Sequence, residues 1–140
     1  MIKNQRQYRI TKTQVKKFKE AIEAFDKKTT DTHPLLAKAQ REALKSQLAE
    51  LMGQLDEYEK LRSGKLKKLK KSSFQHLPIE LIRARIARGL TQKDLARKLG
   101  VKEQQIQRYE ETDYASASLS RVNEVIKALD IEVKEEITLG

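Results

Sequence analysis

Apolar residues recur at helical intervals near the start of the chain. They lie three or four residues apart and predict one apolar helix face: Val15, Phe18, Ile22 and Phe25. Thr11 and Gln14 have the spacing of a capping box, so we expect this helix to begin at Thr11. The stretch from Asp31 to Pro34 should end it and open a second helix, because proline is disfavoured inside a helix but suits its first turn.

The second predicted helix extends from Pro34 to about Arg62 and carries a narrow apolar seam. Its residues alternate four and three positions apart: Leu44, Leu48, Leu51, Leu55 and Tyr58. This alternation is the spacing of a coiled coil, in which another helix covers the seam. The covering helix can belong to the same chain or to a second copy, and the pattern leaves both open. We expect residues 1–62 to form a helical hairpin or coiled coil that supplies dimerisation or binds a protein partner.

Shorter apolar runs, punctuated by glycines, follow in the second half of the chain. The first run leads to Gly89, which should end a helix; Thr91 then caps a second helix that Gly100 closes. A third helix is predicted to begin near Lys102. Two short helices joined by a three- to four-residue turn that contains Gly form the helix-turn-helix geometry. The core of this domain, residues 77–130, is expected to comprise Ile82, Ile86, Leu90, Leu95, Leu99, Val101, Ile106, Tyr109, Leu119, Val122, Ile126 and Leu129.

The C-terminal residues 131–140 follow a different period. Apolar residues occupy alternate positions, which predicts a short strand: Ile131, Val133, Ile137 and Leu139. A lone strand needs a partner. That partner is either residues 7–10 of the same chain or the same strand of a second copy. The fold class is therefore mainly α, and either this strand or the seam of the second helix is a candidate dimer interface.

Charge is unevenly distributed along this chain of 140 residues, whose formal net charge is +10. The segment from Arg62 to His76 holds six basic residues and no acid: Arg62, Lys65, Lys67, Lys68, Lys70 and Lys71. Residues 79–108 hold eight basic and three acidic residues, a balance of +5, whereas residues 109–140 hold three and eight, a balance of −5. A domain with one positive half presents a face for phosphate groups.

Residues 63–76 are interpreted as a basic linker, because Ser63 and Gly64 mark a change of composition. Its lysines are either a solvated charge run or contacts to a phosphate backbone. The sequence has no run of apolar residues near the length of a membrane span and no signal-peptide pattern at its start. It also contains no cysteine, which suits a reducing compartment. We therefore expect a cytoplasmic, nucleoid-associated protein without a membrane partner.

No candidate for catalysis stands out in the sequence. His33 and His76 are isolated, with no carboxylate or second histidine at ligand or triad spacing, so both are interpreted as surface or boundary residues. A glycine-rich phosphate loop and a nucleophile motif are also missing from the sequence. We expect a protein that is not an enzyme and needs neither a cofactor nor a metal.

One stretch of the second half carries a specific resemblance. The sequence Gly89-Leu-Thr-Gln-Lys-Asp-Leu-Ala-Arg-Lys-Leu-Gly-Val101, followed by Gln105-Ile-Gln-Arg-Tyr-Glu110, resembles the Xre/Cro helix-turn-helix family of phage repressors, bacterial regulators and antitoxins. The resemblance covers about residues 79–130 and implies a five-helix domain. The chain departs from the family at Lys102, where Ser or Thr is usual, and after Glu110, where the usual Gly and Pro are missing.

The resemblance also implies where DNA is bound. The third helix would enter the major groove, and its candidates for reading base edges are Glu103, Gln104, Gln105 and Arg108. Gln92 matches a family position that contacts phosphate and braces the third helix. Further backbone contacts are expected from Lys93, Lys102, Arg83, Arg85 and Arg88.

These observations lead to one function and leave an alternative. The chain is expected to bind double-stranded DNA as a homodimeric transcriptional regulator, either a repressor or an antitoxin with a toxin as protein partner. The alternative is a protein-interaction module that uses the helical hairpin, with the helix-turn-helix as a scaffold. Single-stranded RNA binding by the basic linker is disfavoured, because aromatic residues are not interleaved with its lysines.

Overall fold

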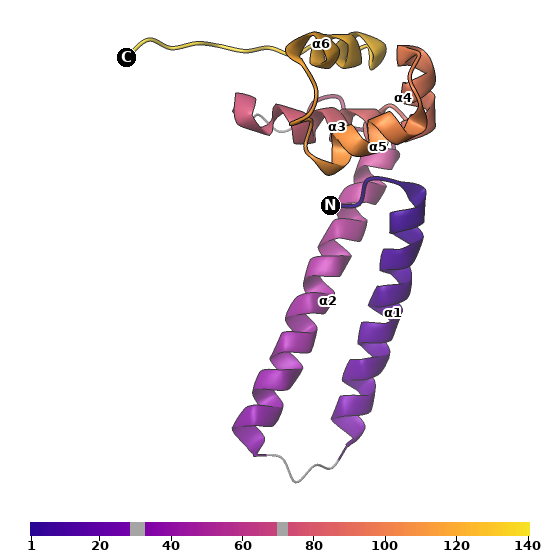
Figure 1. Ribbon diagram of the computed structural model, residues 1–140. Helices are drawn as coiled ribbons and strands as arrows, with labels where there is room; N and C mark the ends of the chain where they lie inside the picture. Colours follow the sequence, from indigo (N-terminus) through magenta and orange to yellow (C-terminus); the bar gives the residue numbers. More distant parts are fainter. Residues whose placement is uncertain (29–32, 70–72) are drawn as a thin grey trace. The chain divides into compact units, whose positions relative to one another are not determined.

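The computed structural model describes residues 1–28, 33–69 and 73–140 (Figure 1). The chain divides into two compact units, Met1–Glu59 and Lys60–Gly140. The predicted break at Asp31 and two lysines of the basic linker, Lys70 and Lys71, lie outside the described residues.

The first unit contains α1 (Gln5–Lys27) and all but the last three residues of α2, which spans Pro34–Arg62. Two contacts show that the helices are antiparallel, as Figure 1 also shows. Near the start of α1, the Tyr8 hydroxyl donates to Glu59 at 2.5 Å. Near its end, Asp26 accepts two hydrogen bonds from Arg41, at 2.6 and 3.1 Å. The helical hairpin expected for this part of the chain is therefore present.

The predicted start of the first helix is wrong. Helix α1 begins at Gln5, because the side chain of Asn4 accepts a hydrogen bond from the N–H of Gln7 at 2.8 Å and so caps the helix. Thr11 lies inside the helix, where its hydroxyl donates to the carbonyl of Gln7 at 2.9 Å. The helix is therefore capped at Asn4 and not at Thr11, where the capping box was predicted.

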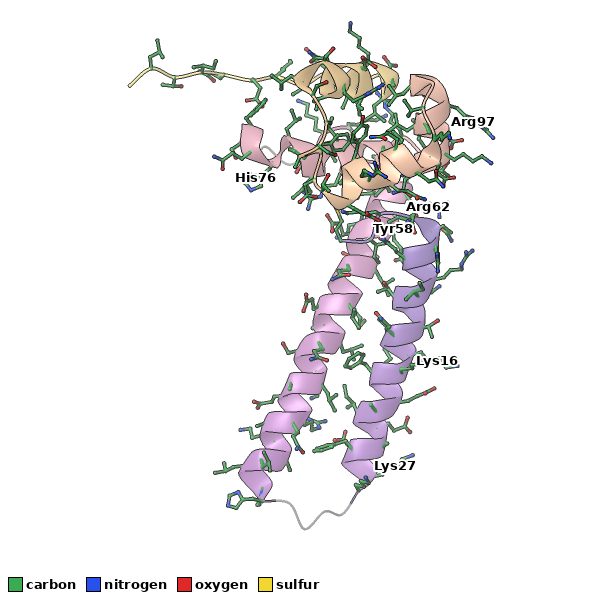
Figure 2. All side chains as sticks on the ribbon, viewed as in Figure 1. Lys16, Lys27, Tyr58, Arg62, His76 and Arg97 are labelled. Atoms are coloured by element: carbon green, nitrogen blue, oxygen red, sulfur yellow. The ribbon has the colours of Figure 1, made fainter. Side chains whose placement is uncertain are left out.

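The apolar seam of α2 is partly covered by α1 within the same chain. The half-buried residues of the seam are Leu44, Leu48, Leu51 and Leu55. The apolar residues Phe18, Ile22 and Phe25 of α1 are half-buried as well. Val15 is buried, and the rings of Tyr8 and Tyr58 stack with centroids 5.1 Å apart. Tyr58 points from α2 toward α1 in Figure 2. Of the two arrangements that the spacing allowed, the structure shows the intrachain one.

The second unit contains a short 3₁₀ helix, η1 (Phe74–His76), and the helices α3 (Leu77–Ala87), α4 (Gln92–Leu99), α5 (Glu103–Glu111) and α6 (Leu119–Ala128). The described residues after η1 form four α-helices, whereas the family resemblance implied a domain of five helices. Residues 112–116 form a turn instead, in which Asp113 and Tyr114 have φ angles of 48° and 59°. This left-handed conformation cannot continue a right-handed helix.

The core of this unit agrees with the predicted one at Ile82, Ile86, Leu95, Ile106, Tyr109 and Leu129, all of which are buried. Leu119 is a correction, because 71% of it is exposed at the start of α6. The structure adds buried residues that the pattern did not predict: Leu81, Ala84, Ala96, Tyr114 and Val125.

Residues 131–140 form neither a helix nor a strand in the single chain, so the predicted strand is not observed. They leave α6 as an extended segment (Figure 1). Ile137 and Leu139 are 88% and 91% exposed. None of the helices in the described ranges is long and apolar enough to cross a membrane.

The start of α4 has the capping box that the sequence predicted. The hydroxyl of Thr91 accepts from the N–H of Asp94 at 3.0 Å, and Asp94 accepts from the N–H of Thr91 at 2.9 Å. The second bond lowers the pKa of the Asp94 carboxyl below its ordinary value of 3.8. The stabilisation from this carboxylate is therefore present above pH 3.8 and is lost as the pH falls through the lowered pKa.

We expect Thr91→Ala to lower the free energy of unfolding by about 1 kcal/mol, since it leaves an N-terminal N–H of α4 without its acceptor. Urea unfolding followed by circular dichroism would measure the change. Thr138→Ala in the exposed tail is the control and should leave the midpoint unchanged. Equal midpoints for both variants would contradict the capping role.

Candidate nucleic-acid interface

Helices α4 and α5 are joined by a three-residue turn, Gly100–Lys102. Gly100 has a φ of 69°, which places it in the left-handed region that glycine tolerates without strain. Its N–H donates to Arg97 at 3.2 Å, and the N–H of Val101 donates to Ala96 at 3.0 Å. These two bonds are a Schellman motif, which ends α4 and redirects the chain into α5.

Packing against α4 fixes which face of α5 is turned outward. Leu95 and Ile106 are fully buried, and Tyr109 is 7% exposed. The opposite side of α5 carries Gln104 and Arg108, both exposed. Because the side chains of α5 divide into an apolar inner face and a polar outer face, the helix presents hydrogen-bonding groups to a partner.

The outer face of α5 borders a shallow hollow of about 480 Å³. Four of the predicted DNA-contacting residues line it: Lys102, Gln104, Gln105 and Arg108. The structure therefore brings together donors that suit phosphate with groups that suit base edges.

Arg121 also lines this hollow, and the sequence did not single it out. It lies in the first turn of α6, where its guanidinium donates to Glu124 at 2.9 Å and its side chain is 27% exposed. Local sequence carries no signal for this position, because the approach of α6 to α5 is a tertiary contact.

Two other candidates, Lys93 and Glu103, are exposed but do not line the hollow. Lys93 lies in the first turn of α4, and Glu103 is the first residue of α5. Lys102 precedes α5 without a side-chain cap, as expected where the family's usual Ser or Thr is replaced. Contacts of these residues with DNA stay predictions.

Gln92 is 6% exposed and braces α5 from the start of α4. Its amide nitrogen donates to Glu110 at 2.9 Å. The structure thus shows a bond between the first residue of α4 and the last turn of α5. The predicted contact of Gln92 with phosphate is not tested by this bond.

Arg85 forms a buried ion pair with Glu110 and joins α3 to α5. Two guanidinium nitrogens donate to the carboxylate at 2.7 and 2.9 Å, and a third bond of 2.8 Å reaches the carbonyl of Leu90. The side chains of the pair are 3% and 1% exposed. The expectation that Arg85 contacts phosphate is wrong, because its guanidinium is enclosed and fully engaged inside the domain.

The other arginines of α3 also have partners within the unit. Arg83 donates to Glu80 at 2.7 Å, three residues earlier on the same helix. Arg88 donates to the carbonyl of Leu129 at 3.0 Å and to that of Asp130, which holds the end of α6. A phosphate contact at either residue stays a prediction and would have to share its guanidinium with these groups.

The two histidines are exposed, as predicted. His33 accepts from the N–H of Leu35 at 3.2 Å, and His76 lies 3.0 Å from the hydroxyl of Ser73. Figure 2 labels His76 in η1, at the edge of the second unit. Over residues 1–28, 33–69 and 73–140, no group of three or more metal-ligating side chains occurs.

Comparison with known proteins agrees with this geometry. The helix-turn-helix family model matches residues 81–135, from the first turns of α3 to beyond α6. The match confirms the resemblance that the sequence indicated over about residues 79–130. No curated protein and no solved structure matches the chain.

Proposed function

Since residues 81–135 form an Xre-type helix-turn-helix domain, a DNA-binding unit of transcription regulators, we propose that this chain reads a specific sequence in double-stranded DNA. The observation that carries the proposal is the outer face of α5. Gln104 and Arg108 are exposed on it and line the adjoining hollow together with the half-buried Gln105, while Ile106 holds the opposite face in the core. A scaffold without a DNA partner has no need for these side chains on that face.

The chemistry of this face suits direct reading of bases. Arg108 can form a bidentate pair with guanine, and the amides of Gln104 and Gln105 can do so with adenine. Glu103, at the start of the helix, can accept from the amino group of cytosine. Each such pair contributes about 1–3 kcal/mol of discrimination against the wrong base.

The residues around this face suit the phosphate backbone. Lys93 and Lys102 are exposed at the first turns of α4 and α5, where their ammonium groups can reach phosphates beside the groove. Gln92 is assigned a bracing role through Glu110, together with the family's phosphate contact. Backbone contacts of this kind set the register of the protein on the duplex without carrying sequence information.

We also propose that the active form is a homodimer that acts as a repressor by occupying a near-palindromic site. Two copies would place their α5 helices in successive major grooves, about 34–36 Å apart. Since α1 already covers part of the α2 seam, we assign the interface to the tail. Its apolar residues Ile137 and Leu139 are almost fully exposed, and an alternating segment needs a second strand.

An antitoxin role is a more specific version of the same proposal. Antitoxins of this family couple DNA binding to a bound toxin protein. Stoichiometric co-purification of one protein with the chain from its own cells would support that role. Purification of the chain alone, with full operator binding, would favour a simple repressor.

Selection of bound duplexes from a random pool at about 150 mM salt tests the proposed function, because non-specific electrostatic binding is weakened there. The expected result is an enriched near-palindrome with half-sites one helical turn apart. If no motif is enriched, the base-reading role is overturned and the alternative of a hairpin-based protein-interaction module gains support.

The dimer interface gives a separate prediction. Ile137→Asp combined with Leu139→Asp should convert the dimer to a monomer in sedimentation velocity, because charges would replace the apolar row of the tail. Affinity for the palindrome should fall about 10²-fold or more, since the second half-site loses its effective concentration. Thr138→Asp adds a charge between the two positions and should leave the dimer intact. An unchanged dimer in the double variant would place the interface elsewhere.

A further inference from the structure

The N-terminal helix carries a second concentration of positive charge, outside the helix-turn-helix domain. Residues 1–19 contain seven Lys or Arg residues and no Asp or Glu. Six of these lie in α1 and are exposed: Arg6, Arg9, Lys12, Lys16, Lys17 and Lys19. We call these six residues the α1 basic face.

The helical period places most of this face on the side of α1 that is turned away from α2, with Lys12 and Lys19 at its border, one turn after Tyr8 and Val15. The residues of α1 that face α2 include Tyr8, Val15 and Ile22, seven residues apart. The basic residues follow mainly three or four positions apart around the rest of the helix, and Lys16 points away from α2 in Figure 2. From Arg6 to Lys19 the helix rises about 20 Å, at roughly 1.5 Å per residue.

Within the described part of the chain, no ion pair joins these six residues to an acid, and Glu20, one turn after Lys16, is the acidic residue of α1 nearest to them in sequence. The ion pairs of α1 lie at its other end, where Glu23 bonds Lys27 at 3.0 Å and Asp26 bonds Arg41 at 2.6 Å. Among the six basic residues, Lys12 lies over the ring of Tyr8, 5.3 Å from its centroid, and remains exposed. A row of like charges without paired counter-charges creates a positive surface potential that attracts an external anion.

The length and density of the row fit a nucleic acid better than other anions. Duplex DNA carries about one charge per 1.7 Å of axis, so about 20 Å of duplex presents roughly twelve phosphates. Insertion into a membrane surface needs a broad apolar face beside the basic one, whereas the apolar row of α1 is buried or half-buried and Ile10, 47% exposed, is the large apolar side chain that α1 leaves in the open. A protein interface of ordinary affinity needs a desolvated apolar or aromatic centre, whereas this face is made of exposed lysines and arginines.

We propose that the α1 basic face is a second, sequence-independent binding surface for the phosphate backbone of duplex DNA. It goes beyond the base-reading function of α5 and does not require it, because its residues belong to the other unit of the chain. In this arrangement α5 selects the site, and α1 adds affinity that is equal for every sequence and strongly dependent on salt.

The test compares two variants of the full chain that remove the same charge. One replaces Arg9, Lys12, Lys16 and Lys19 of the basic face with Gln. The control replaces four exposed lysines elsewhere in the hairpin region with Gln: Lys27, Lys28, Lys38 and Lys45. Binding to a short duplex of arbitrary sequence is measured by fluorescence anisotropy over a range of salt concentrations. Circular dichroism confirms that both variants keep their helix content.

The basic-face variant should lower the slope of log affinity against log salt by about 3 to 4, since each lost phosphate contact removes about 0.9. The control variant should change it by less than about 1. Equal changes in both variants, or an unchanged slope in the basic-face variant, would overturn the proposal. The proposal would also be overturned if the basic-face variant lost binding to phosphatidylserine vesicles while its duplex slope was retained. That result would assign the face to a membrane surface.

This readout is independent of base reading. Arg108→Ala, measured in parallel on selected and arbitrary duplexes, reports whether α5 discriminates between sequences. Failure of the proposed function would show as equal affinity of the unmodified chain for both duplexes, with the slope difference between the two charge variants still present. Failure of the present inference would show as loss of that slope difference, with sequence discrimination intact.

Discussion

Replacing Arg85 with Met is expected to lower the free energy of unfolding by about 3–5 kcal/mol. The side chain of Glu110 would keep a hydrogen bond from Gln92 but lose both bonds from the guanidinium, while remaining 1% exposed. A buried carboxylate without its counter-charge either stays charged at a high desolvation cost or binds a proton, and both weaken the native state. Natural domains have about 5–15 kcal/mol of stability, so this change removes a large part of it.

The control for this experiment is Arg97→Met on α4. Arg97 is exposed and points away from the domain in Figure 2, so the same chemical change should alter stability by less than about 0.5 kcal/mol. Urea unfolding of the two variants would measure the difference. A loss below about 1 kcal/mol for Arg85→Met would show that the pair contributes little beyond an exposed ion pair.

A double variant distinguishes the stability that the ion pair contributes from the cost of leaving one buried charge without its partner. Arg85→Met combined with Glu110→Leu removes both charges, so it should be less destabilised than the sum of the single variants. Gln92 would then lose its acceptor, which limits the recovery. Because Glu110 lies in the last turn of α5, a change in the orientation of that helix would appear as weaker operator binding in the folded double variant.

The parts of the domain that the sequence predicted are those fixed by near neighbours. The cap formed by Thr91 and Asp94 spans three residues, and the left-handed Gly100 follows from its own lack of a side chain. The helical period likewise placed Leu95 and Ile106 in the core. Each of these features depends on residues that lie within about two helical turns of one another. Sequence patterns of helical period report on neighbours at that separation.

The parts that were missed depend on contacts between distant segments. Arg85 and Glu110 are 25 residues apart, and an arginine on a basic helix gives no sign that it is buried. Arg121 joins the α5 hollow only because α6 packs nearby. Two positions of α6 also differ from the prediction: Leu119, in its first turn, is exposed, whereas Val125, which the pattern did not place in the core, is fully buried.

The turn after α5 was missed for a different reason. The chain lacks the family's usual glycine there, and Asp113 and Tyr114 adopt the left-handed conformation in its place. Tyr114 stacks on Tyr109 with ring centroids 5.7 Å apart, and burial raises the pKa of its hydroxyl. Packing of a buried aromatic ring thus offsets a backbone conformation that local preference disfavours.

The largest expected effect on function belongs to the outer face of α5. A triple variant with Ala at Gln104, Gln105 and Arg108 should lose at least a hundredfold in affinity for the selected operator, because each base pair contact contributes about 1–3 kcal/mol. Its affinity for an arbitrary duplex should fall much less, since the phosphate contacts that carry non-specific binding remain. Electrophoretic mobility shifts on the two duplexes at the same salt concentration would measure both losses.

A matched control carries Ala at Ser120, Asn123 and Lys127, which are exposed on α6 and outside the hollow. It also removes two neutral polar groups and one positive charge, so general charge effects are equal in the two triple variants. The control should bind the operator as the unmodified chain does. If the α5 variant instead lost the same factor on operator and arbitrary duplexes, its residues would contact only the backbone. Direct reading of bases by α5 would then be wrong, because a base contact must weaken one sequence more than another.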